Sequence, residues 1–118
     1  MSLTTPVIHR GDIFLVNLDP TVGREISKTR PCVIIQNDIG NINSPVTIIA
    51  CITSNTSRAN FQINVFITAL ETGLPQDSVI LLNQIRTIDK SRLVRKMGQV
   101  PLNKMQLVDK ALELSLDL

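Results

Sequence analysis

The stretch that decides the fold is Val46-Thr47-Ile48-Ile49-Ala50-Cys51-Ile52-Thr53, an apolar run rich in β-branched residues. Its length and composition predict a β-strand rather than a helix. A second run, Pro31-Cys32-Val33-Ile34-Ile35-Gln36, is almost continuously apolar, which is typical of a central strand buried on both faces. Residues 37–45 lie between the two runs and contain Gly, Asn, Ser and Pro. They predict a turn-rich connection between neighbouring strands.

Similar short runs continue on both sides of this pair, with turn signals between them. They predict further strands at 13–18, 62–67, 78–82 and 93–99. The period changes after Pro101, and residues 102–116 follow helical spacing. The expected fold class is therefore mainly β (a β-rich α+β domain), a small barrel or sandwich of antiparallel strands with a C-terminal helix. Because the chain has only 118 residues, positions 1–118 are expected to form a single domain.

The predicted C-terminal helix is apolar on two sides. One stripe comprises Leu102, Met105, Val108, Leu112 and Leu116, and a second comprises Leu107, Ala111, Leu114 and Leu118. The first stripe is sufficient to dock the helix on its own sheet. Because the second stripe needs another partner, we expect either a homodimer contact or a helix sunk in a deep groove of its own chain.

The composition excludes several functional classes. The first residues do not resemble a signal peptide and no apolar run has the length of a membrane span, so a cytoplasmic protein without membrane association is expected. A net charge of +2 does not indicate a large nonspecific nucleic-acid binder. Seven basic residues do lie between 86 and 110, where they could steer a phosphate chain or simply form a solvated face. Cys32 and Cys51 match no redox or zinc spacing and are expected to be buried and reduced.

Elimination narrows the possible chemistry further. His9 is the only histidine, so a two-histidine acid–base ribonuclease site cannot form within one subunit, and His9 itself is expected at the surface. No cluster of His, Cys and carboxylate residues has the spacing of metal ligands, and Gly-rich phosphate loops are absent from the sequence. No metal and no cofactor are therefore expected. The polar groups that remain are Arg, Thr, Ser, Asn and one loop glutamate, Glu25.

Four blocks of the sequence resemble the MazF/PemK toxin family. They lie at 10–25 (Arg10-Gly11-Asp12-Ile13, then Leu18-Asp19-Pro20-Thr21-Val22-Gly23-Arg24-Glu25), 29–38, 49–54 and 77–90. Each block alone is a weak signal, but the four occur in the family's order and together reach the C-terminal helix. The resemblance implies a compact SH3-like barrel of the CcdB/PemK type, a C-terminal helix and a homodimer.

The resemblance also implies a metal-independent, sequence-specific endoribonuclease that cleaves single-stranded RNA or mRNA and leaves 2′,3′-cyclic phosphate and 5′-hydroxyl ends. Arg30 and Thr53 match the family's catalytic arginine and threonine. A guanidinium can hold two nonbridging phosphate oxygens, and a threonine hydroxyl can donate to developing charge. Because arginine rarely loses its proton, the general base stays open, with Glu25 as a candidate. Segments that line the RNA groove in the family contain four further candidates, Lys28, Asn37, Asn83 and Gln84.

The family further implies a regulating partner, a cognate MazE-like antitoxin whose flexible acidic tail covers the RNA groove. Two alternatives are weighed against this hypothesis: a CcdB-like toxin that poisons DNA gyrase by protein contact without catalysis, and a noncatalytic small barrel that binds nucleic acid. The positions of Arg30 and Thr53 favour the nuclease. The small number of aromatic residues, three phenylalanines in all, disfavours a platform that stacks many bases.

Overall fold

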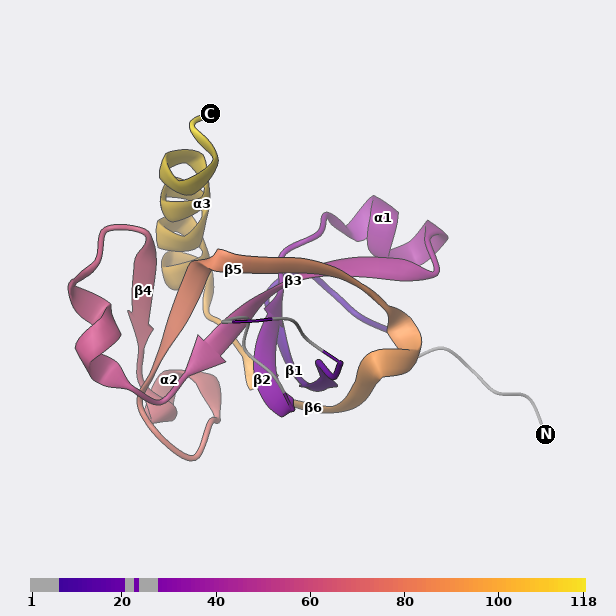
Figure 1. Ribbon diagram of the computed structural model, residues 1–118, viewed down its shortest axis with the longest axis horizontal. Helices are drawn as coiled ribbons and strands as arrows, with labels where there is room; N and C mark the ends of the chain where they lie inside the picture. Colours follow the sequence, from indigo (N-terminus) through magenta and orange to yellow (C-terminus); the bar gives the residue numbers. More distant parts are fainter. Residues whose placement is uncertain (1–6, 21–22, 24–27) are drawn as a thin grey trace.

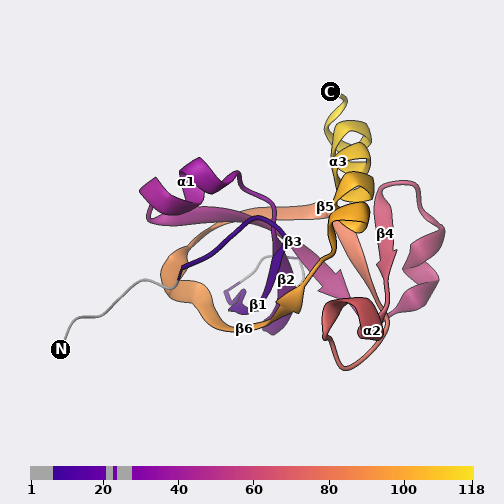
Figure 2. The same ribbon diagram turned by 180° about the vertical axis from the view of Figure 1, so that it is seen from behind.

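In the computed structural model, which describes residues 7–20, 23 and 28–118, six strands form one antiparallel sheet in the order β4-β5-β3-β2-β1-β6 (Figures 1 and 2). The elements are β1 (Asp12–Asn17), β2 (Thr29–Ile34), α1 (Asp38–Asn43), β3 (Val46–Thr53), the 3-10 turn η1 (Thr56–Asn60), β4 (Asn64–Ile67), α2 (Ala69–Thr72), β5 (Ser78–Asp89), the 3-10 turn η2 (Lys90–Arg92), β6 (Leu93–Gln99) and α3 (Leu102–Leu116). A mainly β fold of antiparallel strands with a C-terminal helix is thereby confirmed. Since the order begins at β4 and ends at β6, the sheet in this part of the chain is not closed into a barrel.

The sheet buries apolar side chains on both of its faces. One core, which includes Val33 and Ile52, lies under helix α3. The other includes Cys32, Ile34 and Cys51. Because successive side chains of a strand point to opposite faces, consecutive residues of β2 contribute to both cores. The expectation of a central strand buried on both faces is confirmed for these residues of β2.

Helix α3 docks along a different line from the one that the two stripes predict. Its buried residues are Met105, Val108 and Ala111, whereas Leu102 is 77% exposed. The helix is therefore rotated so that its docking line runs between the predicted stripes, through the small Ala111. The outward-facing Leu107 and Leu114 stay 47% and 54% exposed in the single chain.

None of the helices in the described part of the chain has the length and the apolar character needed to span a membrane.

The connection at 37–45, for which the sequence predicts a turn-rich segment, contains the helix α1. Asn37 caps α1, and its side-chain oxygen accepts a hydrogen bond from the Gly40 amide at 2.8 Å. The buried Asn41 then ties the helix to the sheet, because its Oδ1 accepts from the Thr47 hydroxyl at 2.8 Å. Gly and Asn have low helix propensity, which is why the sequence predicts turns here. The N-cap and the buried network of Asn41 offset that low propensity and stabilise the helix.

Strand β5 extends to Asp89, well beyond the predicted end at residue 82. In the ladder with β3, Cys51 pairs with Leu81 while the adjacent Ala50 pairs with Ile85. Residues 82–84 therefore form a bulge, after which the pairing resumes. The break in alternation at the bulge explains why the sequence pattern predicts only the first part of the strand.

Candidate active site

A cleft of about 190 Å³ lies where the pairing between β2 and β3 ends. The last pair of this ladder is Cys32 with Cys51. Arg30 and Thr53 lie two residues beyond that pair on their respective strands, so a continued register sets them opposite each other. Both residues line the cleft. The structure thus brings together the two residues that the sequence selects for catalysis.

The hydroxyl of Thr53 is oriented by the backbone that follows it. Its Oγ1 accepts a hydrogen bond from the Asn55 amide at 3.1 Å. Asn55 in turn caps η1, and its Oδ1 accepts from the Ser57 hydroxyl at 2.6 Å. With the oxygen held in this way, the hydroxyl proton of Thr53 can be donated to a group in the cleft.

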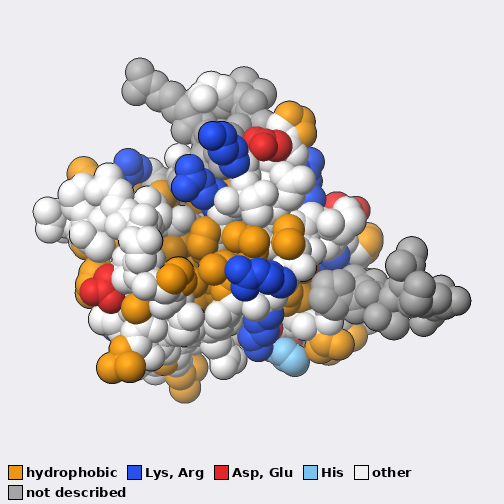
Figure 3. All heavy atoms as spheres, turned by 90° about the horizontal axis from the view of Figure 1, so that it is seen from below, with side chains coloured by type: hydrophobic (Ala, Val, Ile, Leu, Met, Phe, Trp, Pro, Cys, Tyr) orange, Lys and Arg blue, Asp and Glu red, His pale blue; other side chains and the backbone are white. Residues whose placement is uncertain are grey.

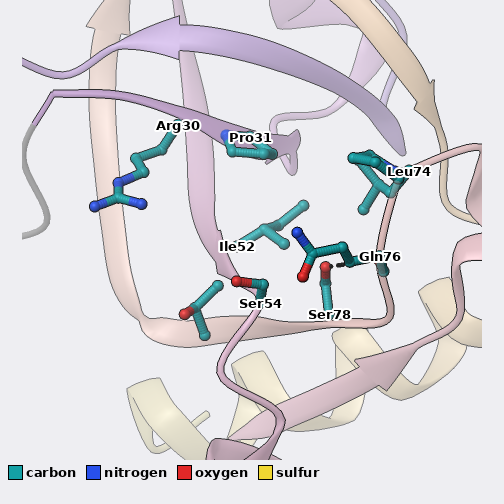
Figure 4. A pocket seen from close by; sticks show the side chains of 9 residues that line it. Arg30, Pro31, Ile52, Ser54, Leu74, Gln76 and Ser78 are labelled. Carbon is teal, nitrogen blue, oxygen red and sulfur yellow. Dashed lines mark hydrogen bonds between the residues drawn. The ribbon is translucent and has the colours of Figure 1, made fainter.

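Arg30 contributes the positive charge of the cleft. It is an exposed residue of β2 and is paired with Val16 in the β1–β2 ladder. Figure 4 shows its guanidinium on one side of Ile52 and the amide of Gln76 on the other. A cation on a rigid strand, lining the same cleft as an oriented hydroxyl, is suited to holding an anionic group such as a phosphodiester.

The loop before β5 forms the opposite rim of the cleft, and sequence reasoning missed its role. It contributes Leu74, Pro75 and Gln76, and the first residue of β5, Ser78, also lines the cleft. The Ser78 hydroxyl donates to the Gln76 carbonyl at 3.0 Å. Only a turn followed by a strand is visible in the sequence here, because the rim is assembled by tertiary contact. Ser54, beside Thr53, is a further lining residue that the sequence analysis did not select.

Comparison with known proteins decides the family. The model described as "PemK-like, MazF-like toxin of type II toxin-antitoxin system" matches residues 9–116. The chain belongs to this toxin family. It is 46% identical over 112 residues to the endoribonuclease EndoA of Bacillus subtilis (strain 168), across 95% of this chain and 97% of the relative. The match does not favour a CcdB-like gyrase poison.

Solved structures of MazF-type toxins share the fold. MazF (Form-I) from Deinococcus radiodurans superposes with a TM-score of 0.82 at 21% identity, covering 96% of this chain and 99% of that one. A mycobacterial endoribonuclease in complex with its cognate antitoxin gives a TM-score of 0.78 at 20% identity, covering 94% and 96% of the two chains. At these identities the likeness establishes the common architecture.

In this MazF/PemK-type chain, the candidate RNA-binding residues Lys28 and Asn37 lie just outside opposite ends of β2. Lys28 is exposed at the entrance to β2, and its backbone amide donates to Asp19 Oδ1 at 2.8 Å. Asn37 lies beyond the opposite end of β2, where it caps α1. The structure therefore brings Lys28, but not Asn37, toward Arg30. The candidate base Glu25 lies outside the described residues.

The other two candidates, Asn83 and Gln84, lie in the bulge of β5. Asn83 is exposed, whereas Gln84 is half-buried. Neither lines the cleft of Arg30 and Thr53, but Asn83 lines a second hollow, beside β4. The bulge removes these amides from the regular ladder and turns one of them outward.

The basic residues between 86 and 110 are less available than their number implies. Five of the seven contact a backbone carbonyl or a carboxylate, namely Arg86, Lys90, Arg92, Lys96 and Lys104. Lys90 is 7% exposed and donates to the Asn41 carbonyl, so it is a structural residue and does not form part of a steering surface. Figure 3 shows that Lys and Arg side chains still border an apolar strip on one face of the molecule.

The thiols of Cys32 and Cys51, beside the cleft, are buried as expected and form no disulfide. Their contact, together with burial, raises the pKa of Cys32 far above its ordinary value, and the same contact lowers the pKa of Cys51. The Cys32 thiol donates a weak hydrogen bond to the Arg30 carbonyl, with 3.6 Å between sulfur and oxygen. Within the described ranges, no group of three or more His, Cys, Asp or Glu side chains is placed to hold a metal ion.

Proposed function

We propose that this toxin is an endoribonuclease that cleaves single-stranded RNA in the cleft between Arg30 and Thr53. The observation that carries the proposal is the presence of both residues on one cleft at the end of the β2–β3 ladder. The proposal is also supported by the similarity, over 95% of this chain, to the Bacillus subtilis relative that is named an endoribonuclease.

RNA supplies its own nucleophile, the 2′-hydroxyl. Deprotonation of that hydroxyl lets O2′ form a bond to phosphorus while the bond from phosphorus to O5′ breaks, which leaves a 2′,3′-cyclic phosphate and a 5′-hydroxyl. Arg30 holds two nonbridging oxygens, and Thr53 donates its hydroxyl to the charge that develops on the phosphorane. A base, for which Glu25 is the candidate, accepts the 2′-hydroxyl proton, and the leaving O5′ takes up a proton from solvent. Because the substrate carries the nucleophile, this scheme needs no metal-bound water.

The proposal includes two partners. A second copy of the chain covers the exposed Leu107 and Leu114 of α3. The other partner is a cognate antitoxin, which the solved complexes of similar toxins with antitoxins support. We infer that this antitoxin covers the RNA-binding surface. A disordered acidic tail suits this role, because it can cover an extended basic groove.

The direct test is incubation of the purified protein with a long RNA in EDTA. Discrete fragments whose 5′ ends accept phosphate from polynucleotide kinase without prior phosphatase treatment would support the proposal. A parallel preparation of Arg30→Ala controls for contaminating ribonucleases. A gel shift without cleavage would indicate a noncatalytic binder, and neither binding nor cleavage would revive the gyrase-poisoning alternative.

A further inference from the structure

Two thiols face each other beside the candidate active site. Cys32 of β2 and Cys51 of β3 are directly opposite partners in the β2–β3 ladder, and both side chains lie in the same core of the sheet. Directly opposite residues of an antiparallel pair have Cα atoms about 4.5–5.5 Å apart, which lies inside the range of about 4.4–6.8 Å that a disulfide spans. The two sulfur atoms can therefore be joined without a change of register.

The surroundings of Cys51 favour a reactive sulfur. The contact with the Cys32 thiol, and then the positive charge of Arg86, lower the pKa of Cys51 in spite of its burial. The guanidinium of Arg86 is held in place, because it donates to the Leu18 carbonyl at 2.8 Å. The thiolate, rather than the thiol, is the species that attacks an oxidant. Cys51 is therefore suited to react first, and Cys32 to react with the oxidised Cys51.

The position of the pair lets a small oxidant reach it by local opening. Both thiols are almost completely buried in the closed sheet. The pair is nevertheless the end of the β2–β3 ladder, and Arg30, two residues away on β2, is exposed. The end of a ladder opens locally at a lower free-energy cost than the whole domain. Opening of this pair exposes the sulfur atoms while the rest of the sheet stays folded.

We propose that Cys32 and Cys51 form a reversible disulfide that switches off the neighbouring cleft. The effect on cleavage rests on the proposed endoribonuclease function, whereas the bond itself rests on the thiol pair alone. Disulfides of proteins in reducing compartments are usually transient and redox-sensing, which fits a pair that is free in this structure.

The oxidant is a hydroperoxide, and hydrogen peroxide is the simplest. The Cys51 sulfur attacks one peroxide oxygen, the O–O bond breaks, and the second oxygen leaves as water after it takes up the proton that Cys51 has lost. Cys51 is then a sulfenic acid. The Cys32 sulfur attacks the Cys51 sulfur, the S–O bond breaks, and the hydroxyl leaves as water with the proton of Cys32. The two thiols lose two electrons in all, and the peroxide gains them.

The disulfide changes the end of β2 that carries Arg30. In the reduced protein the Cys32 thiol donates to the Arg30 carbonyl, and a disulfide has no S–H with which to make this contact. Arg30 and Thr53 are the next residues on the same faces of their strands, so their separation depends on the geometry of the cysteine pair. A displacement of about 1 Å at a reacting group can cost on the order of 10²-fold in rate. We therefore expect the disulfide to slow single-turnover cleavage by about 10-fold or more.

The test compares the reduced wild-type protein with the same protein after treatment with hydrogen peroxide. Mass spectrometry of the treated chain should find the loss of two hydrogen atoms and, after digestion, two peptides joined through Cys32 and Cys51. The treated protein should cleave RNA more slowly by the factor given above, and dithiothreitol should restore the rate.

The double variant Cys32→Ala with Cys51→Ala is the matched control. It keeps the three methionines of the chain, which peroxide also oxidises, but it has no thiol. Its cleavage rate should be the same before and after peroxide, and thermal unfolding checks that it is folded. Reversal by dithiothreitol gives the same distinction in the wild-type protein alone, because dithiothreitol reduces a disulfide and leaves methionine sulfoxide unchanged.

Each part of the proposal has its own contradicting result. Thiols that stay free, or that become sulfinic acids without a bond between them, would overturn the disulfide. A disulfide that leaves the cleavage rate unchanged, or a rate loss that dithiothreitol does not reverse, would overturn its control of the cleft. A reduced wild-type protein that cleaves no RNA would instead overturn the proposed function, and the mass measurement would still decide whether the disulfide forms.

Discussion

Cys32 and Cys51 lie directly opposite each other in the β2–β3 ladder, and both thiols are buried. Arg30 and Thr53 follow this pair at the next positions on the same faces of their strands. The spacing of the two site residues is therefore set by an ordinary antiparallel register, anchored by a small buried pair beside them.

A buried network around Asn41 should account for part of the stability of the protein. The Asn41 side chain donates to the Gln36 carbonyl at 2.9 Å and accepts from Thr47, and its carbonyl accepts from the Lys90 ammonium. We expect Asn41→Ala to lower the free energy of unfolding by about 1–3 kcal/mol, because it leaves buried partners unpaired. Urea titration measures the change, and Asn43→Ala, on the exposed side of α1, is the control. Equal midpoints for the two variants would contradict the role of the network.

Acid should weaken the attachment of α1 to the N-terminal segment. The Arg10 backbone amide, at 2.7 Å, and then the Asn41 side chain hold the pKa of Asp38 below its ordinary value. A carboxyl whose pKa is lowered in the folded state stabilises the protein at pH values above its ordinary pKa of about 3.9. This contribution is lost as the pH falls through the folded-state pKa. The difference in unfolding free energy between wild type and Asp38→Asn should therefore shrink below about pH 4. A difference that stays constant from pH 7 to pH 2 would exclude this linkage.

The exposed apolar side of α3 predicts a dimer contact. Leu107 and Leu114 line a hollow beside β4 that also contains Phe66 and Lys104. Leu107→Glu combined with Leu114→Glu should weaken self-association without unfolding, because neither residue belongs to the buried core. Sedimentation equilibrium tests this, with Leu102→Glu as a control on the same helix. An unchanged dimer in the folded double variant would show that the interface lies elsewhere.

RNA and the antitoxin tail should compete for one surface. Lys28, Arg30 and Arg95 are exposed cations that can attract either a phosphate chain or an acidic peptide. A noncleavable RNA analogue should weaken binding of the tail, and the tail should weaken binding of the analogue by the same factor. Association should slow as salt is added, because screening reduces steering. Calorimetry that finds the two ligands bound independently at saturation would place inhibition at a separate site.

Most of the fold could be predicted from composition and period. The boundaries of β3, β6 and α3 follow from apolar runs and from the change to helical spacing after Pro101. Helix α1 could not be predicted, because its stability comes from the Asn37 cap and the buried Asn41 rather than from helix propensity. The docking line of α3 depends on which neighbour it meets, and the helix sequence does not contain that information.

Only the candidate-site residues at the ends of predicted strands could be selected from the sequence. Arg30 and Thr53 follow from the resemblance and from their positions at the ends of apolar strands. Gln76 and Ser78 reach the cleft through a loop from another part of the chain, so no local pattern indicates them. No local pattern distinguishes the buried Lys90 from the other basic residues between 86 and 110. Its burial depends on a hydrogen bond to a backbone carbonyl of α1, which is a tertiary contact.

The measurement that tests the central claim most directly is the single-turnover cleavage rate of Arg30→Ala, with Arg30→Lys and Thr53→Ala alongside. Each alanine variant should cleave on the order of 10²-fold more slowly or worse, because one contact to the transition state is lost. Arg30→Lys should also lose most activity, since an ammonium cannot hold two oxygens in a planar fork. Lys110→Ala removes the same charge from α3, which lines no part of the cleft, and should cleave at nearly the wild-type rate. A folded Arg30→Ala that cleaves RNA as fast as the wild-type protein would contradict the account.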